Sequence, residues 1–532
     1  MTVNLAAAAG NPAINVSIFV AVVAVTLFIV YRVSSKNTTT ADYYAAGSSF
    51  TGLQNGFALS GDYLSAASFL GIAGAIAVYG YDGFLFSVGF LVAWLVPLLL
   101  VAEKIRNTGR FTMGDVVSFR MKQRPVRAAA ANATLVISFF YMLAQMAGAG
   151  ALVALLLDVH STGGQALVIG VVGLIMVFYV LVGGMKGTTW VQIVKAAMLL
   201  ICVALMSVFI LGKFGLSLSD LLGRAVSNNA IDSAILEPGA RYGRTGTSKL
   251  DFVSLSLALV LGAAALPHVL MRFYTVPNAV QARRSVVWAI WAMVLFYLST
   301  LIIGYGASAL VGSDAIINAP GGENSAAPLL AFEIGGTVLL GIVSAVAFTT
   351  ILAVVAGLTL TASASFAHDV YANVIKHGKP EPGAEIKVAR LTAVVVGCLA
   401  VGGGILATGQ NVAFLVALAF ALAASANLPA ILYTLFWRRF NTTGTLWSIY
   451  GGLATCLILI TFSPVVSGSP TAIFSGIDFQ WFPLSNPGLI SIPLSFALGV
   501  VGTIVGEKKG DTSSLKRQAE MEVRSVTGIG SN

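Results

Sequence analysis

Charged side chains are scarce in this 532-residue chain, where Asp, Glu, Lys and Arg together make up 10% of the residues, against roughly 25% in a soluble domain. Cysteine is also rare, and Cys202, Cys398 and Cys456 all stand inside long apolar runs, so neither a disulfide framework nor a cysteine metal motif can be read. The four histidines are scattered. No HExxH pair and no pair of facing catalytic aspartates is present, so an intramembrane enzyme is not expected.

Apolar residues, by contrast, make up 57% of the chain. A run of about 20 such residues can cross the ~30 Å hydrocarbon core of a bilayer. The sequence therefore predicts an all-α polytopic membrane protein with about thirteen transmembrane helices, near residues 14–32, 52–79, 83–103, 128–157, 165–184, 188–212, 250–272, 286–311, 334–366, 388–408, 411–437, 445–465 and 486–506.

Basic residues explain the net charge of +9. If the N-terminus lies outside, most of the 30 Lys and Arg, Arg272 among them, fall at span ends and loops that face the cytoplasm, as the positive-inside rule requires. We therefore expect a multi-pass protein of the cell (plasma) membrane with a cytoplasmic C-terminus and no nucleic-acid partner. Lys195 is the one basic residue within a span, and its amine is expected to reach the cytoplasmic interface.

The spans divide the chain into four parts. Residues 1–36 carry an extra N-terminal helix, 441–506 two accessory helices, and 507–532 a polar, disordered cytoplasmic tail. Within 40–440, five spans begin in the cytoplasm and the next five begin outside, which is the arrangement of an inverted-topology repeat. The basic segment 106–127 is expected to form a helix on the cytoplasmic membrane surface.

Asp62 is the single charged residue between Asp42 and Asp82. A charge at the bilayer centre costs about 2.5–3.5 kcal/mol on insertion scales and usually faces a bundle interior or a wet cavity. The small residues around Asp62 permit either an unwound helix at a binding site or a close helix contact with a solvated Asp62. The second half opens on a similar break, Gly262–His268, where Pro267 removes a backbone donor. Paired breaks in matching positions predict a central binding site.

Four motifs resemble those of one transporter family. The sequence DYYAAG at 42–47 resembles the DYxxAG entry motif of the sodium:solute symporter family. Three later motifs of the same family are similar to segments of this chain, namely GGMKGTTWVQ at 183–192, PHVLMRF at 267–273 and WRRFNTTG at 437–444. The stretches GDYLSAASFLG and ILAVVAGLTL look closest to its cation/acetate symporters and other monocarboxylate permeases. The resemblance spans residues 40–505. It implies a LeuT-like core of five plus five helices, alternating access, and a sodium site between the first and eighth core helices.

The resemblance also implies the ligands of that cation. They are two backbone carbonyls, two hydroxyls and a carboxylate, from Gly61, Leu64, Thr349, Thr350 and Asp62, and oxygen ligands suit a hard cation. Counted without gaps from Asp369, however, the hydroxyl pair falls on Ala353 and Val354, and the two threonines require an insertion of about one turn. The coupling ion is therefore Na⁺ or, if the site is degenerate, H⁺. No other cofactor is expected.

Polar groups near the two breaks are the candidates for substrate binding, namely Ser60, Ser65, Ser68, His268 and Asn427. Two alternatives stand beside this interpretation. The serine hydroxyls can bond back to their own helix, and His268 can be a packing residue that is hydrogen-bonded to a neighbouring helix. The spans 286–311 and 334–366 carry no charge or amide, so a small, mostly apolar acid fits better than a sugar.

These observations favour a secondary active symporter, not an enzyme. It would couple inward flow of Na⁺ or H⁺ to uptake of a short monocarboxylate such as acetate, propionate or pyruvate. A sodium symporter for proline, pantothenate or a sugar is the alternative. A channel is less favoured, because a channel needs a continuous polar path or a filter repeat rather than broken helices in inverted halves.

Overall fold

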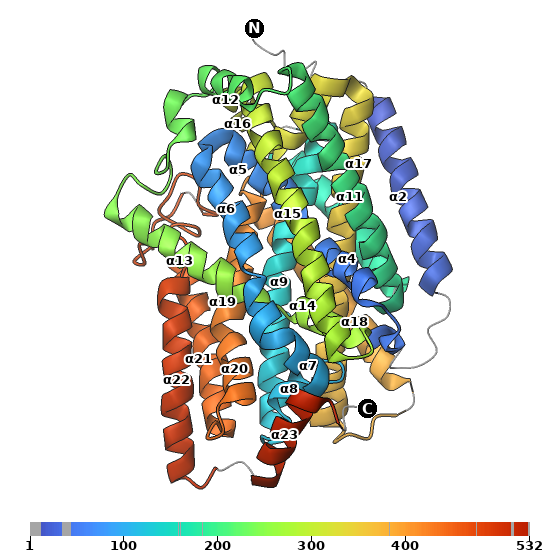
Figure 1. Cartoon of the computed structure of the whole chain (residues 1–532), viewed down its shortest axis with the longest axis vertical. Helices are drawn as coiled ribbons and strands as arrows, with labels where there is room; N and C mark the ends of the chain where they lie inside the picture. Colours follow the sequence, from blue (N-terminus) through green and yellow to red (C-terminus); the bar gives the residue numbers. More distant parts are fainter. Residues whose placement is uncertain are drawn as a thin grey trace.

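The computed structural model describes residues 12–34, 44–157, 159, 161–182, 185–381, 383–474, 476–511 and 515–529. The described residues form an elongated bundle of helices (Figure 1). Besides helices and turns they contain one isolated β-bridge, between Ser467 and Phe474. The all-α prediction is confirmed. The first two residues of the 42–47 motif and of the 183–192 motif lie outside the described residues.

Ten helices in the described part of the chain are long and apolar enough to cross a membrane, and a bent pair brings the number to eleven. Two further helices, α2 (Pro12–Ser34) and α10 (Thr162–Val182), lie over the predicted spans 14–32 and 165–184. The ten long spans are Tyr81–Thr108, Gln123–Leu156, Met185–Lys213, Gly246–Thr275, Ala279–Leu310, Gly322–Ile375, Ala384–Leu406, Val412–Phe436, Thr442–Thr461 and Gly488–Lys508. Each overlaps a predicted span, and the chain is a multi-pass membrane protein.

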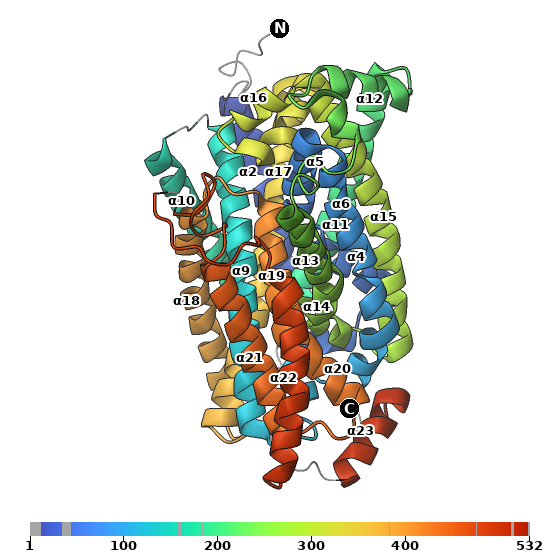
Figure 2. The same ribbon diagram turned by 90° about the vertical axis from the view of Figure 1, so that its left-hand side faces the viewer.

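The two most buried of the long spans contain the helices α17 (Ala326–Ala364) and α19 (Val412–Ala426), followed equally by Gly246–Thr275 and by the span of α9 (Gln123–Leu156). Figures 1 and 2 show α21 (Thr442–Thr461) and α22 (Gly488–Lys508) packed side by side on one flank of the bundle. On another flank, α2 packs against α17 and against α11 (Met185–Lys213). The charged groups at the centre of the bundle therefore come from helices with many neighbours.

The first predicted helix break is present. The helix α4 (Gly52–Tyr63) stops at Leu64, whose ψ of 81° is not helical. The π-helical turn η2 (Ala67–Gly71) and α5 (Ile72–Tyr79) then continue the span, bent by 61° from α4. The last carbonyls of α4 have no partner in a following turn of the same helix, so they must find donors elsewhere in the bundle.

The second predicted break is also present. The helices α13 (Gly246–Gly262) and α14 (Pro267–Arg272) are separated by Leu266, whose ψ of 120° is the extended geometry that a following proline imposes. The carbonyl of Ala265 in this break accepts a hydrogen bond of 3.0 Å from Nδ2 of Asn427, the residue that follows α19. The break in one helix is therefore satisfied by a side chain at the interruption of another.

The segment 106–127 does not form the predicted surface helix. It contains the end of α7 (Ala102–Thr108), the short helix α8 (Met113–Val117) and the first turn of α9. Arg120 turns inward, where its guanidinium donates hydrogen bonds of 2.5–3.0 Å to the carbonyls of Tyr433, Trp437 and Arg438. These carbonyls lie at a helix end, which attracts basic donors, so a basic sequence does not by itself indicate a lipid-facing helix.

The C-terminal segment was expected to be disordered, and for residues 515–529 that prediction is wrong. The helix α23 (Leu515–Thr527) packs against α7. Arg438 holds both carboxylate oxygens of Glu522, at 2.6 and 2.9 Å. The partner of this polar helix lies far away in the sequence, and composition alone could not indicate it.

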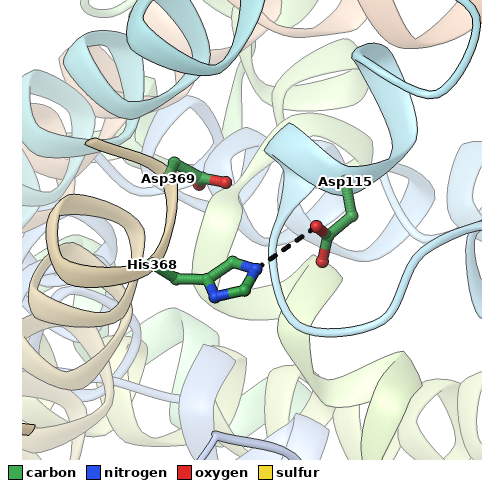
Figure 3. Close-up of side chains that lie close together, drawn as sticks. All are labelled: Asp115, His368 and Asp369. Atoms are coloured by element: carbon green, nitrogen blue, oxygen red, sulfur yellow. Dashed lines mark ion pairs between the residues drawn. The ribbon is translucent and has the colours of Figure 1, made fainter. Parts of the chain in front are cut away.

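Arg127 joins two carboxylates, the buried Asp369 and the partly exposed Asp115. Its Nη1 lies 2.9 Å from Asp115 Oδ1 and 2.7 Å from Asp369 Oδ1, and Nε2 of His368 lies 3.5 Å from Asp115 (Figure 3). The two carboxylates and the imidazole have the donor types of a metal site, but the guanidinium supplies the positive charge there. Burial by itself would raise the pKa of Asp115, whereas His368 and Arg127 beside it hold that pKa well below its usual range.

Replacement of Arg127 by methionine should therefore lower the free energy of unfolding by about 3 kcal/mol, because the buried Asp369 and the partly exposed Asp115 both lose their partner. The substitution should have its full effect on the free energy of unfolding at neutral pH. A carboxyl with a depressed pKa contributes stability above its ordinary pKa of about 3.9, and this contribution disappears as the pH falls below that value. The midpoint of thermal unfolding in detergent measures the effect. Arg124→Met, at an exposed position one turn earlier, is the control, and equal midpoints for the two variants would contradict this assignment.

Candidate functional site

Asp62 lies at the end of α4 and is only 1% exposed. Its Oδ2 forms an ion pair with Nε of Arg272, at the end of α14, and its Oδ1 accepts a hydrogen bond of 2.6 Å from Nε2 of Gln192. The alternative of a solvated Asp62 is wrong. The positive-inside count placed Arg272 at a cytoplasmic span end, but its side chain is buried inside the bundle. The ion pair therefore links the broken end of α4 to α14, the short helix that follows the second break.

Three polar side chains of α11 face the ion pair. Thr189, Gln192 and Lys195 are spaced three apart, so they lie on one face of the helix. Thr189 accepts a hydrogen bond from Nη1 of Arg272, and Gln192 donates to the carbonyl of Ala353 at 2.7 Å as well as to Asp62. Gln192 therefore links α11 both to α4 and to α17.

The ammonium of Lys195 is buried, with 1% of the residue exposed, and donates to the carbonyl of Gly61. The expectation that Lys195 reaches the cytoplasmic interface is therefore wrong. Its partner is one of the carbonyls at the broken end of α4, where donors are needed. Gly61 also allows α4 to touch α11, since a Cβ there would lie 2.4 Å from the carbonyl oxygen of Gln192. Only glycine permits such a close approach of two backbones.

Most of the oxygens predicted to bind a cation already have partners. The carbonyl of Gly61 accepts from Lys195, and both carboxylate oxygens of Asp62 accept from neighbours. Thr350 bonds back along its own helix, to the carbonyl four residues earlier, at 2.8 Å. The hydroxyl of Thr349 is buried and has no hydrogen-bond partner among the described residues.

The turn of α17 that faces Asp62 lies after the two threonines. The Ala353 carbonyl shares the Gln192 amide with Asp62, and a Cβ on Gly357 would lie 3.0 Å from Asp62 Oδ1. The stretch Ala353–Gly357 is AVVAG and has no side-chain oxygen. This placement agrees with the alignment counted without gaps from Asp369. A hard cation favours several free oxygen ligands, and the donors at this position do not fit a sodium ion.

The three candidate serines each have a bond within their own segment, and Ser68 also reaches Tyr297 of another helix. Ser60 donates to the carbonyl of Phe57 at 2.9 Å, and the hydroxyl of Ser65 accepts from the Ala67 N–H at 3.2 Å. The Ser68 hydroxyl lies 3.4 Å from the Tyr63 carbonyl and 3.3 Å from the hydroxyl of Tyr297. Their local bonds are those of the first alternative, in which serines satisfy the broken backbone.

His268 and Asn427 keep unused polar atoms. Neither ring nitrogen of His268 has a hydrogen-bond partner in the described part of the chain, although the residue is 3% exposed. The alternative of a His268 hydrogen-bonded to a neighbouring helix is therefore not supported. The amide nitrogen of Asn427 donates to the Ala265 carbonyl. Its Oδ1 has no hydrogen-bond partner among the described residues. Buried polar atoms without partners are costly, and these two belong to the second helix break.

Aromatic rings lie beside His268 and beside the residue that follows Asp62. The His268 ring meets the edge of Tyr141 with centroids 5.2 Å apart. Phe420 lies 6.2 Å from Tyr141 and 5.8 Å from Tyr63, the residue after Asp62. The edge-to-face arrangement of these rings is favourable for aromatic packing. An apolar and aromatic wall therefore adjoins the charged centre.

The charged centre contains two basic side chains and one acidic side chain. Among the described buried residues, Asp62, Lys195 and Arg272 interact electrostatically here. One carboxylate opposes one ammonium and one guanidinium. An uncompensated charge in a low-dielectric interior is costly, so the centre favours a further anion.

Sequence reasoning identified Asp62, His268 and both breaks, but it missed the partners of Asp62. The signal for them was the spacing of Thr189, Gln192 and Lys195 at intervals of three in an otherwise apolar helix, which predicts one polar face. Arg272 gave no such signal. A basic residue at the end of a span is what the positive-inside rule leads one to expect.

Comparison with known proteins supports the resemblance drawn from the four motifs. Residues 43–452 match the sodium:solute symporter family. A monocarboxylic acid transporter of Corynebacterium glutamicum is 57% identical over 531 residues, which cover 98% of this chain and 96% of the relative. The uncharacterized symporter YwcA of Bacillus subtilis is 48% identical, over 96% of this chain and 98% of the relative.

Two solved structures share the fold. The substrate-bound, outward-open state of a Na⁺-coupled sialic acid symporter has a TM-score of 0.70 at 15% identity and covers 92% of this chain and 97% of its own. The nucleobase-cation-symport-1 family transporter Mhp1, in a closed conformation with bromovinylhydantoin bound, has a TM-score of 0.55 at 12% identity. The match covers 92% of this chain and 99% of the Mhp1 chain. Since the family match covers well over half of its length, the chain belongs to the sodium:solute symporter family.

Proposed function

We propose that this chain is a secondary active symporter that takes up a short monocarboxylate, such as acetate, propionate or pyruvate, by alternating access. The observation that carries the proposal is the buried centre of Asp62, Lys195 and Arg272, whose excess positive charge suits one carboxylate. A Corynebacterium relative of nearly the same length is named a monocarboxylic acid transporter. A neutral sugar or a zwitterionic amino acid would leave the excess charge in place.

The substrate is placed between the two helix breaks. His268 and Asn427 have free polar atoms there, and we assign them the contacts with the carboxylate, with Arg272 as its counter-charge. Tyr63, Tyr141 and Phe420 then enclose a short alkyl chain. Ser60, Ser65 and Ser68 are assigned to the unwound backbone, because their hydroxyls are engaged locally.

The finer architecture belongs to the same proposal. Residues 40–440 are taken as two inverted repeats of five helices, preceded by an extra helix in 1–36 and followed by two accessory helices in 441–506. The N-terminus then lies outside the cell membrane and the C-terminus in the cytoplasm, which agrees with the distribution of Lys and Arg. The ion pair between α4 and α14, the two helices next to the breaks, supports this arrangement, since transporters with inverted repeats hold their substrates near such paired breaks.

The first test is substrate uptake by purified protein in proteoliposomes. Labelled acetate, propionate or pyruvate should accumulate against its gradient and saturate, because alternating access binds one substrate at a time. Proline and glucose are the comparison substrates. Accumulation of either of these without a monocarboxylate would refute the substrate assignment, and flux that never saturates would indicate a channel.

The second test is Asp62→Asn. This change leaves two buried positive charges without an anion, so gradient-driven accumulation should fall by about tenfold or more. Protein yield in the membrane and the midpoint of thermal unfolding separate a transport defect from a folding defect. Asp220→Asn, at an exposed position of the helix Leu218–Ser227, is the matched control. Normal accumulation by a well-folded Asp62→Asn protein would show that the carboxylate is dispensable.

The third test is His268→Phe, which keeps the ring packing against Tyr141 and removes both nitrogens. A hydrogen bond to a charged group contributes about 1.5–3 kcal/mol, so the KM for the monocarboxylate should rise about tenfold or more. His377→Phe is the control, because His377 stands in the turn after η8 (Ser365–Ile375), well away from both helix breaks in the sequence. Initial rates over a range of substrate concentrations give KM, and an unchanged value would remove His268 from the substrate site.

A further inference from the structure

A lysine side chain holds one of the oxygens that the family resemblance assigns to a sodium ion. The ammonium of Lys195 donates to the Gly61 carbonyl, the first of the oxygens predicted to bind the cation. We propose that Lys195 takes the place of that sodium ion in this chain, and that monocarboxylate uptake is therefore independent of Na⁺. The inference rests on the proposed symport of a monocarboxylate and goes further by removing sodium from it.

The oxygen donors support this replacement. Gly61 and Asp62 already accept hydrogen bonds from Lys195, Gln192 and Arg272. The facing turn of α17 has only alanine, valine and glycine side chains, in the stretch 353–357. Sodium would have to displace several charge-assisted hydrogen bonds and would find no side-chain oxygen in that turn.

The packing of α4 on α11 supports it as well. The two backbones meet at Gly61, where even a Cβ would lie 2.4 Å from the carbonyl oxygen of Gln192. Lys195 stands one turn further along the same face of α11 and extends its amine to the end of α4. An ammonium is a compact point charge with three donors, so it can stabilise a free carbonyl as a bound cation would, without leaving when the solution changes.

The charges give the third reason. Asp62 of α4 and Arg272 of α14 face Lys195, and His268 of α14 lies within the same set of interacting groups. With Lys195 charged, the centre already has one positive charge in excess. A sodium ion would double that excess in a buried site, whereas a monocarboxylate neutralises it.

The first experiment asks whether the protein binds sodium at all. The purified full-length chain is heated in detergent with increasing NaCl, and KCl and choline chloride at equal ionic strength serve as references. A ligand that binds the folded state raises the unfolding temperature in a saturable way. We expect the three salts to give the same curves. A saturable rise specific to Na⁺ in the wild-type protein would overturn the inference.

The second experiment measures labelled acetate counterflow and gradient-driven uptake in proteoliposomes. Wild-type uptake should be equal with Na⁺ or K⁺ on both sides of the membrane. Lys195→Met should reduce accumulation by about tenfold or more, and Lys186→Met, a half-buried lysine on the same helix, should not. Full accumulation by Lys195→Met, or uptake that requires Na⁺, would overturn the inference.

The two experiments separate the inference from the proposed function. If the wild-type protein shows no counterflow with acetate, propionate or pyruvate, the proposed substrate class fails, and the melting curves still decide whether sodium binds. If counterflow is present and sodium stabilises the protein, the substrate class stands and Lys195 does not replace the ion. Since the sodium measurement uses wild-type protein, it stays decisive even if Lys195→Met does not fold.

Discussion

The ion pair between Asp62 and Arg272 is the interaction on which the centre of this protein depends. Each residue belongs to a helix that is broken in the middle of the bundle, and breaking a helix in an apolar medium leaves carbonyls and N–H groups without partners. The ion pair joins the broken end of α4 to the far end of α14, while Gln192 satisfies a carbonyl of α17 and Asn427 a carbonyl of the second break. Broken backbone and buried charge therefore stabilise one another, and neither would be tolerated alone.

The sequence was sufficient to predict the features that come from local chemistry. A lone charge among small residues located the first break, and a proline in an apolar run located the second, because these residues act on their own backbone. The family followed from four motifs in order, and the comparisons confirm it. The long apolar runs likewise predicted the spans, since the thickness of a bilayer fixes the length of a crossing helix.

Partnerships between distant residues were beyond such reasoning. Arg272 and Lys195 both look like ordinary basic residues near a membrane interface, and only the folded chain shows that their side chains turn inward. The same limitation explains the wrong prediction for the C-terminal helix, whose Glu522 pairs with Arg438 from another part of the chain. A positive-inside count records where a residue stands along the chain but cannot record the direction of its side chain.

At two oxygen-rich sites of this protein, a basic side chain offsets the cost of burying negatively charged oxygens. At Asp115 and Asp369 the positive charge comes from Arg127, and at Gly61 and Asp62 it comes from Lys195 and Arg272. A covalently attached cation differs from a bound ion in one respect that matters for a transporter: it cannot be exchanged with the solution. The amine that holds the Gly61 carbonyl then stays in place whatever the sodium concentration of the solution.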